Sequence, residues 1–387
     1  MSYVFDQVIE RRGSGAVKWD LARDNTLPMW VADMDFAAAP EVVSALRERL
    51  AHPVFGYTLV SDSYRQAFCD WQRQRNRLQL DPDWMLATPG VMPAVRAAID
   101  ALSQPGDSVV VQTPVYHPFF DAVRAAGRRL RINALRQTDL RYRMDLDQLE
   151  ALFRSGARLL LMSSPHNPVA RVWSETELQQ VCSLARRWNV TIISDEIHSD
   201  IVFSGARFVS LLSLAPERCV VCFSVSKTFN LAGIGASQTV VPDETLRSRL
   251  SASLKRSGLS SIENTLSLVA AEAAYRHGAP WLDALLEYLQ GNLELLRALL
   301  VQRLPGVRLT PQQGCYIAWL DFGALQRDRG LSDAQLKRLL LERARVWLSP
   351  GVQFGRGGAG FQRLNFATPR SVLRQGIERI GDALAID

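Results

Sequence analysis

The chain has 387 residues, of which 47% are hydrophobic and 22% are charged, and its formal net charge is +6. This is the composition of an ordinary globular protein, long enough for two domains or for one large domain with an appendage. Its arginines are spread along helix-like segments and no apolar run approaches the ~20 residues that span a bilayer, so neither a nucleic-acid partner nor a membrane partner is expected.

The first two thirds of the chain alternate between helix-like and strand-like segments. A capping box formed by Ser174 and Glu177 opens one of the helical patterns. Continuous apolar strands that alternate with helices are typical of a parallel sheet covered on both faces. The segments predicted here are helices at 40–51, 61–75, near 117–126 and at 174–188, and strands at 108–114, 157–165, 190–196 and 219–227.

From about residue 281 the pattern changes and predicts a second, smaller α+β domain. In it, "CYIAWLDF" alternates like a half-exposed strand, and "SPGVQFGRGGAG" is a glycine-rich loop. The other segments predicted here are a long helix at 281–303, a helix near 332–343, a strand at 361–367 and a last helix.

The cysteines and the first residues favour a cytoplasmic protein. "MSYVFDQVIERRGSG" has no apolar core of signal-peptide length, and five cysteines in this length make no disulfide framework. Cys219 and Cys222 form a lone C-x-x-C, which we interpret as two small residues of a buried strand. A zinc site needs two further ligands at a matching spacing, so no metal site is expected.

Polar residues follow three of the predicted strands, at the point where each strand ends. They are Asn167, Asp195 and Lys227, separated by 28 and 32 residues. Each separation is about one strand–helix unit, and ligands bind at the carboxyl ends of strands in open α/β sheets. We therefore expect three neighbouring strands to bring these side chains together.

A glycine in "TPGVMPAV" marks a junction between a strand and a helix. The backbone amides of Gly90, Val91 and Met92 can face an anion at the helix N-terminus, where the helix dipole favours phosphate. An ordinary tight turn remains the alternative interpretation.

An amide, an acid, a lysine and a phosphate cradle together suit pyridoxal 5′-phosphate (PLP). This cofactor bonds a lysine and needs an acid near its pyridine nitrogen, which keeps the ring able to accept electrons. The lysine must react as an amine, and burial or nearby positive charge lowers a lysine pKa readily.

In its order of motifs, G-x-x-x-A, Y, N-P, D-E-x-H and S-x-S-K, the chain resembles fold-type I PLP enzymes, the aspartate aminotransferase superfamily. Within that superfamily it resembles the MalY/PatB-type cystathionine β-lyases, which are carbon–sulfur lyases, from about residue 3 to 380. The segments that carry this resemblance are "VADMDF", "VFGYT", "SPHNPVARVW", "SDEIHSD", "SKTFNLAGI", "GLSS", "GAPWLDAL" and "RLNFATPR".

The resemblance implies an α/β fold of the aspartate aminotransferase type, with a mostly parallel seven-stranded sheet in a large domain and a smaller α+β domain. The implied boundaries are an N-terminal segment (1–45) that packs with the small domain, a large PLP-binding domain (46–283) and a small C-terminal domain (284–387).

The resemblance also implies roles for the residues at the strand ends. Lys227 resembles the Schiff-base lysine, which also moves the substrate Cα proton. Asp195 resembles the partner of the pyridine nitrogen, and Asn167 the donor to the cofactor's phenolic oxygen. Tyr116 resembles the aromatic residue stacked on the ring, with core packing as the alternative.

Further residues resemble ligands of the phosphate and the substrate. Ser224 and Ser226 resemble phosphate ligands beside the amides named above, and Tyr57 resembles a phosphate ligand from a partner subunit, which implies a homodimer with shared active sites. On the substrate side, Arg363 resembles the arginine that forks the α-carboxylate, a bidentate contact that lysine does not reproduce. Asp33 and Asn167 are also expected near the substrate. His198 is either a donor behind the site or a satisfied core histidine.

Two positions depart from the common aminotransferase pattern. Gly235 stands where many aminotransferases carry a phosphate-binding arginine, and the lyase subgroup tends to lack that arginine too. Ala170 replaces the glycine of N-P-x-G, and if this position has a positive φ, alanine costs roughly 1 kcal/mol there.

The sequence therefore favours an α,β-elimination that releases thiol, pyruvate and ammonia from L-cystathionine or a related S-substituted cysteine. A class I/II aminotransferase on the same scaffold is the alternative, because both reactions use the same lysine, acid and arginine. A regulatory protein that keeps the fold is a further, less favoured alternative.

Overall fold

A computed structural model describes residues 3–259 and 264–385, so Ser260 and Ser261 of the "GLSS" motif lie outside the described residues. Among the described residues, seven strands form the large sheet in the order β2-β10-β9-β8-β7-β3-β4. Strand β10 is antiparallel to both neighbours and every other pairing is parallel, which confirms the predicted sheet. The strands are Met85–Thr88 (β2), Ser108–Thr113 (β3), Arg129–Ala134 (β4), Ala157–Ser163 (β7), Thr191–Asp195 (β8), Cys219–Ser224 (β9) and Ser237–Val240 (β10).

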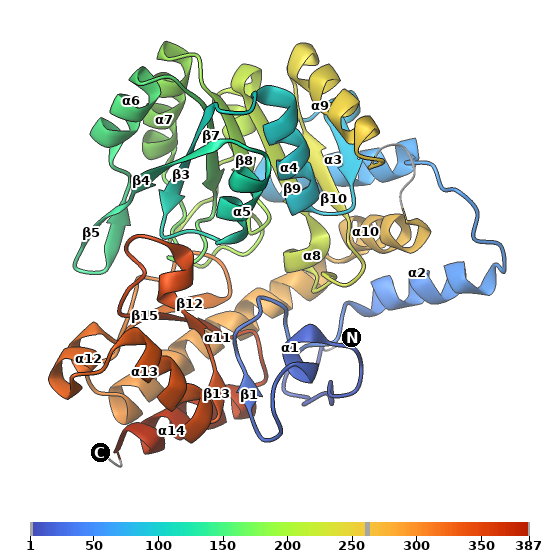
Figure 1. The fold of residues 1–387 in the computed structure, drawn as a ribbon. Helices are drawn as coiled ribbons and strands as arrows, with labels where there is room; N and C mark the ends of the chain where they lie inside the picture. The colour runs from blue at the N-terminus through green and yellow to red at the C-terminus, as the bar shows by residue number, and fades with distance from the viewer. Residues whose placement is uncertain (1–2, 260–263, 386–387) are drawn as a thin grey trace.

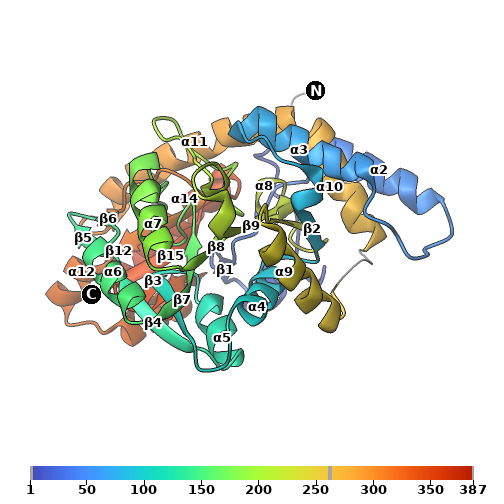
Figure 2. The same ribbon diagram turned by 90° about the horizontal axis from the view of Figure 1, so that it is seen from above.

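The apolar strands are buried on both faces because helices cover both sides of the sheet. Successive strand residues belong to opposite cores: Leu160 packs in one hydrophobic cluster, and Leu159 and Leu161 pack in the other. Figure 2 shows α4, α5 and α9 on one side of the sheet and α6 and α7 on the other. The helices of this domain are Asp62–Asn76 (α3), Val91–Leu102 (α4), Pro118–Ala125 (α5), Leu146–Arg154 (α6), Glu175–Arg187 (α7), Glu244–Arg256 (α9) and Thr265–His277 (α10).

Several short sequence patterns in this domain predicted the structure correctly. The capping box predicted for Ser174 and Glu177 is present at the start of α7. Cys219 and Cys222 are buried on β9, as interpreted. One prediction was wrong, because the strand expected at 219–227 ends at Ser224. Residues Val225–Thr228 form a short helix instead (α8). The Ser224 hydroxyl accepts a hydrogen bond from the Ser226 amide and so caps the first helical turn.

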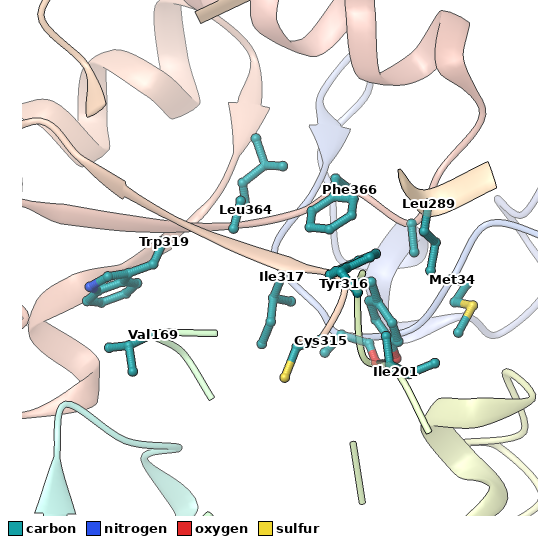
Figure 3. Close-up of a cluster of buried hydrophobic side chains, with 14 of the residues drawn as sticks. Met34, Val169, Ile201, Leu289, Cys315, Tyr316, Ile317, Trp319, Leu364 and Phe366 are labelled. Atoms are coloured by element: carbon teal, nitrogen blue, oxygen red, sulfur yellow. Dashed lines mark hydrogen bonds between the residues drawn. The ribbon is translucent and has the colours of Figure 1, made fainter. Parts of the chain in front are cut away.

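The smaller domain holds an antiparallel sheet of four strands within the described part of the chain, in the order β11-β12-β15-β14. The prediction of a half-exposed strand at "CYIAWLDF" was wrong, since all five residues of β12 are buried. Figure 3 shows one reason: Trp319 points toward Val169 of the large domain. The elements are Ala279–Arg303 (α11), Arg308–Leu309 (β11), Ile317–Asp321 (β12), Gly323–Arg329 (α12), Asp333–Arg338 (α13), a π-helical turn Leu339–Arg343, Val346–Trp347 (β13), Ser349–Pro350 (β14), Phe361–Asn365 (β15) and Arg370–Ala385 (α14).

The N-terminal segment lies along the small domain before the chain enters the large one (Figure 1). It contains Val17–Asp20 (α1) and Leu27–Pro28 (β1), and β1 pairs in parallel with β13. Helix α2 (Pro40–Ala51) then packs against α10. The domain boundaries at 45 and 283 stay a prediction, and α11 runs across the second of them.

The remaining minor elements are a hairpin and several 3-10 turns. The hairpin joins Arg136–Thr138 (β5) with Arg141–Arg143 (β6), and the 3-10 turns lie at Pro82–Trp84, Leu211–Ser213, Pro216–Arg218 and Gly351–Phe354. Across residues 3–259 and 264–385, no helix combines the length and the apolar character needed to cross a membrane.

Candidate active site

A cavity of about 760 Å³ lies at the carboxyl ends of the central strands, between the large domain, the small domain and the N-terminal segment. This volume is within the range of roughly 300–1,000 Å³ typical of small-molecule sites. The three polar side chains predicted to meet all line it: Asn167 follows β7, Asp195 ends β8 and Lys227 follows β9. They meet because β7, β8 and β9 are neighbours in the sheet.

Lys227 lies in the short helix α8, with its amine directed to the N-terminal segment. Its Nζ donates a hydrogen bond to the carbonyl oxygen of Ala32, at 2.6 Å. Burial lowers the pKa of this amine to about 8, and the opposing charge of Asp33 limits the shift. An appreciable fraction of Lys227 is therefore neutral near pH 7 and available as a nucleophile or a base.

Asp195 is a buried carboxylate at the end of its strand. Its Oδ1 accepts a hydrogen bond from the Ile197 amide, at 3.1 Å. Burial raises the pKa of Asp195 to about 6. The carboxylate is therefore ionised near pH 7 and can pair with a cationic ring nitrogen brought into the cavity.

Arg363 on β15 supplies a buried cation on the facing wall. Its guanidinium donates to the Asn167 side-chain oxygen at 3.2 Å and to the Trp30 carbonyl at 2.8 Å. Burial lowers its pKa to about 10, so Arg363 remains charged near pH 7. No carboxylate in the described chain forms an ion pair with it, and its Nε has no hydrogen-bond partner there. A buried cation in this state suits the carboxylate of an incoming ligand.

The predicted phosphate cradle is present in part. Val91, Met92 and Ser226 line the cavity, and α4 begins after Gly90 without any side-chain cap, which leaves its first amides available to an anion. Gly90 is therefore the cap position rather than part of the cavity wall. Ser224 is not brought to the wall either, because its hydroxyl is bonded to Ser226 and to the Ala236 carbonyl.

Tyr116 and His198 both line the cavity. The Tyr116 ring packs against Phe119, at 5.9 Å between centroids, and burial raises its pKa. His198 packs edge-on against Tyr316, and burial lowers its pKa to about 3, so it is neutral. Its Nδ1 has no hydrogen-bond partner among the described residues, which does not match a satisfied core histidine, and its role as a donor behind the site stays a prediction.

Besides Gly90 and Ser224, two more predicted site residues do not line the cavity. Asp33 pairs instead with Arg11 at 2.8 Å and with Lys18 at 3.6 Å, so it acts on Lys227 through its charge rather than by contact with a ligand. Tyr57 lies on a loop after α2 and is 90% exposed, so its role toward a partner subunit stays a prediction.

The sequence reasoning missed how much of the site the N-terminal segment builds. The Ala32 carbonyl accepts hydrogen bonds from both Lys227 and the Tyr316 hydroxyl. Trp30 stacks on Trp347 of β13, with ring centroids 4.4 Å apart. The segment "VADMDF" could have revealed this role of the N-terminal segment. Its two acidic residues stand between apolar residues, a pattern that indicates carboxylates buried in ion pairs.

Comparison with known proteins identifies the family. Residues 27–380 match the family described as aminotransferase class I and II. The chain belongs to the aminotransferase class I and II family. It is 40% identical to cystathionine beta-lyase PatB of Bacillus subtilis (strain 168), over 98% of this chain and 100% of that protein. It is 34% identical to protein MalY of Escherichia coli (strain K12), over 98% of each chain.

A solved structure of a carbon–sulfur lyase shares the fold closely. The PLP-bound C-S lyase from Staphylococcus hominis is 30% identical and superposes with a TM-score of 0.94, over 99% of this chain and 98% of that one. The predicted resemblance to PLP-dependent carbon–sulfur lyases with an aminotransferase-like fold is thereby confirmed.

The structure explains the first of the two departures from the aminotransferase pattern and shows the backbone conformation at the second. Gly235 has a φ of 65°, and a Cβ there would lie 2.8 Å from the Pro89 carbonyl oxygen. No arginine fits at this position without a shift of the backbone. Ala170 has a φ of 58°, so the positive φ considered for it is present.

The residues on the cavity wall fit PLP. A buried lysine of lowered pKa, a buried carboxylate, an aromatic ring and an uncapped helix N-terminus are the groups that this cofactor needs at its aldehyde carbon, ring nitrogen, ring face and phosphate.

Proposed function

We propose that this chain is a PLP-dependent carbon–sulfur β-lyase, which converts L-cystathionine or a related S-substituted cysteine and water to a thiol, pyruvate and ammonia. The observation that carries the proposal is that Lys227, Asp195 and Arg363 line one cavity, and that Arg363 has no carboxylate partner among the described residues. The 40% identity to a cystathionine beta-lyase supports the same proposal. PLP, when bound, supplies an electron sink for the pair released at the substrate Cα.

The side chains of this protein hold the cofactor and the substrate in fixed places. Lys227 would bond the cofactor, Asp195 would keep its ring nitrogen protonated, and Tyr116 would supply an aromatic side chain to the pocket that holds it. The first turn of α4 and Ser226 take the phosphate. Arg363 takes the substrate α-carboxylate by two parallel hydrogen bonds, with the Asn167 oxygen beside it.

Lys227 also moves the proton. Once its amine is free and neutral, it is the base that takes the Cα proton, and its lowered pKa suits this task near pH 7. The electron pair left behind expels the sulfur from Cβ as thiolate.

The test uses L-cystathionine without any 2-oxo acid. Pyruvate and homocysteine should accumulate in equal amounts over many turnovers. An aminotransferase relies on the same residues but stops after one turnover until an amino acceptor is added. A single-turnover burst that resumes only with 2-oxoglutarate would overturn the lyase proposal.

We further propose that the active unit is a homodimer in which Tyr57 contacts the cofactor phosphate of the partner. The loop after α2 is rich in exposed apolar side chains, which favours burial against another chain: Val54, Phe55, Tyr57 and Leu59.

Mixed subunits test the shared site. Inactive Lys227→Ala chains and inactive Tyr57→Ala chains should regain activity when mixed, because one of the two hybrid sites holds both wild-type residues. No recovery after confirmed subunit exchange, or a fully active monomer, would contradict the shared site.

A cytoplasmic location is also proposed. Its support is that the five cysteines are buried and unpaired, as in proteins of reducing compartments. Fractionation of cells that express the tagged chain should recover it with cytoplasmic markers, and recovery outside the cytoplasm would contradict the proposal.

A further inference from the structure

A second cavity, of about 630 Å³, lies at the joint between the large and the small domain. It is lined by the hairpin β5–β6, the loop after β7, the first turn of α7 and the loop between β11 and β12, and it shares no lining residue with the candidate active site. Figure 2 shows the hairpin beside β12, where the Trp319 indole donates a hydrogen bond to the Tyr142 hydroxyl at 3.1 Å. The proposed elimination gives this cavity no role.

The hairpin belongs to a strongly basic segment. Residues 128–158 hold eight arginines, no lysine and four acidic residues, so this segment carries +4 of the net charge of +6. The arginines are therefore less evenly spread than the helix-like segments suggested. Most of the excess positive charge of the chain lies on β4, the hairpin and their neighbours, and such a concentration of charge attracts anions.

The acidic residues on the wall of the second cavity are already paired. Glu177 accepts two hydrogen bonds from the Arg171 guanidinium, at 2.6 and 2.8 Å. Asp139, whose side chain is 87% exposed, lies 3.6 Å from the Arg308 guanidinium. Neither acid is therefore left to neutralise the other cations on the wall.

Arg141 and Arg143 of β6 are the cations on this wall that lack a counter-charge. Both are exposed, and neither side chain forms a hydrogen bond or an ion pair with any described residue. They are two residues apart on a strand, so their Cα atoms are roughly 7 Å apart. The Arg171 Nε adds a further donor, since it is buried and has no partner in the described chain. A guanidinium binds a carboxylate or a phosphate by two parallel hydrogen bonds, so this wall suits two anionic groups.

Buried apolar side chains form much of the remaining wall. They are contributed by both domains: Leu140, Tyr142, Val169 and Pro311. An inorganic anion would leave this surface unused, whereas a carbon frame between two anionic groups would cover it and gain from its removal from water.

We infer that the second cavity binds an organic dianion, a small molecule with an anionic group at each end of an apolar carbon frame. Arg141 and Arg143 bind the anionic groups, and the apolar side chains cover the frame. This inference goes beyond the proposed lyase function and does not depend on it.

Such a ligand contacts both domains at a joint that already depends on polar contacts. The Gln313 side-chain oxygen of the small domain accepts hydrogen bonds from Arg171 at 2.8 Å and from the Val172 amide at 3.2 Å. Val169 and Arg171, which line the cavity, belong to the loop that carries Asn167 of the candidate active site. A molecule bound here therefore strengthens the joint next to that loop.

Three probes that differ in their end groups test the inference on the PLP-loaded protein. Adipate carries two carboxylates, adipamide two neutral amides and 1,6-diaminohexane two ammonium groups. In isothermal titration calorimetry, adipate should bind saturably and the other two should not. The affinity for adipate should fall as salt screens the arginines, and adipate should raise the Tm because it binds the folded state.

Variants assign the binding to residues. An exposed ion pair is worth roughly a 2- to 5-fold effect, so the double variant Arg141→Gln, Arg143→Gln should raise the Kd for adipate by at least about 4-fold. The matched control is the double variant Arg129→Gln, Arg131→Gln, which removes the same charge from β4 of the same basic segment, outside the cavity. This control should leave the Kd unchanged, and so should Arg363→Gln in the candidate active site.

Four results would overturn the inference. They are no saturable binding of adipate in the millimolar range, equal binding of adipamide, equal weakening by the β4 control, and loss of adipate binding in Arg363→Gln alone, which would place adipate in the active site. Each of them leaves the lyase proposal intact. A failed elimination assay would in turn leave the binding of adipate at Arg141 and Arg143 intact.

Discussion

The two walls of the cavity are built in different ways. On the large-domain wall, Asn167, Asp195 and Lys227 stand at the ends of adjacent strands, and the hydrogen-bonded ladders of the sheet fix their spacing. On the facing wall, Arg363 and the Ala32 carbonyl are brought together by contacts between chain segments that are hundreds of residues apart. Regular secondary structure positions the first wall, whereas the second, although Arg363 lies on β15, also depends on individual polar contacts between distant segments.

The facing wall depends on a small polar network in the N-terminal segment. Asp35 is buried and accepts hydrogen bonds from Lys18 at 2.7 Å, from Arg11 at 2.7 Å and from the Trp19 indole at 2.8 Å. Burial raises the pKa of Asp35, but these three donors outweigh it and the pKa is lowered overall. Asn365 adds hydrogen bonds to the carbonyls of the same segment. The comparison implies that damage to the first wall removes chemistry, whereas damage to the polar network behind the second wall loosens the structure.

The largest effect is expected at Lys227. Lys227→Ala should lower kcat by at least roughly 10³-fold, since the side chain is both the cofactor bond and the base. Borohydride reduction of the wild type should fix the cofactor to a peptide that contains Lys227, with Lys255→Ala as an active control. Recovery of the cofactor on a peptide that contains Lys255 would show that Lys227 does not bind it.

Asp195 should give the next largest loss. Asp195→Ala removes the carboxylate that stabilises a cationic ring nitrogen, and a loss of roughly 10²–10³-fold in kcat is expected while circular dichroism stays unchanged. Asp195→Asn, which keeps the size but not the charge, should lose nearly as much. Wild-type kcat in either variant would remove Asp195 from the reaction.

Asp35 tests the second wall through stability. Asp35→Asn leaves the amine of Lys18, which is 1% exposed, with only the more distant Asp33 as a counter-charge. The free energy of unfolding should fall by about 3 kcal/mol, seen as a lower Tm of the cofactor-free protein.

Asp328→Asn, at an exposed position on α12, is the control for this measurement and should leave the Tm unchanged. An unchanged Tm for Asp35→Asn as well would mean that the ion pairs do not hold this wall.

The smallest expected effect is in the pH dependence of cofactor uptake. Burial lowers the pKa of Lys227 to about 8, so the neutral fraction grows as the pH rises through that value. About one tenth of the amine is neutral at pH 7, compared with about one in three thousand for a lysine with an ordinary pKa. The rate at which cofactor-free protein takes up PLP should therefore rise about tenfold per pH unit below 8 and level off above it. A midpoint near pH 10 would show that Lys227 is not buried as described.

The sequence by itself determined four of the seven strands of the large sheet, the strand ends that carry Asn167 and Asp195, the capping box of α7 and the family, but it did not reveal β2, β4 and β10. These features follow from local patterns: apolar runs of strand length, helical spacing and motifs of a few residues. The sequence placed Lys227 correctly at the end of its strand but predicted the strand to be three residues too long. The strand ends early because α8 begins where the Ser224 hydroxyl accepts a hydrogen bond, which the sequence pattern does not show.

Only the tertiary structure decided the rest. Three features depend on which distant segments pack together: the burial of β12, the ion pairs that hold Asp33 away from the cavity, and the lowered pKa of Lys227. Gly235 is a further example. A side chain at this position would clash with the carbonyl oxygen of Pro89, which is far away in the sequence, so the sequence alone does not explain why glycine is needed there. Burial, electric field and steric exclusion are set by neighbours in space, and a pattern along one chain does not contain them.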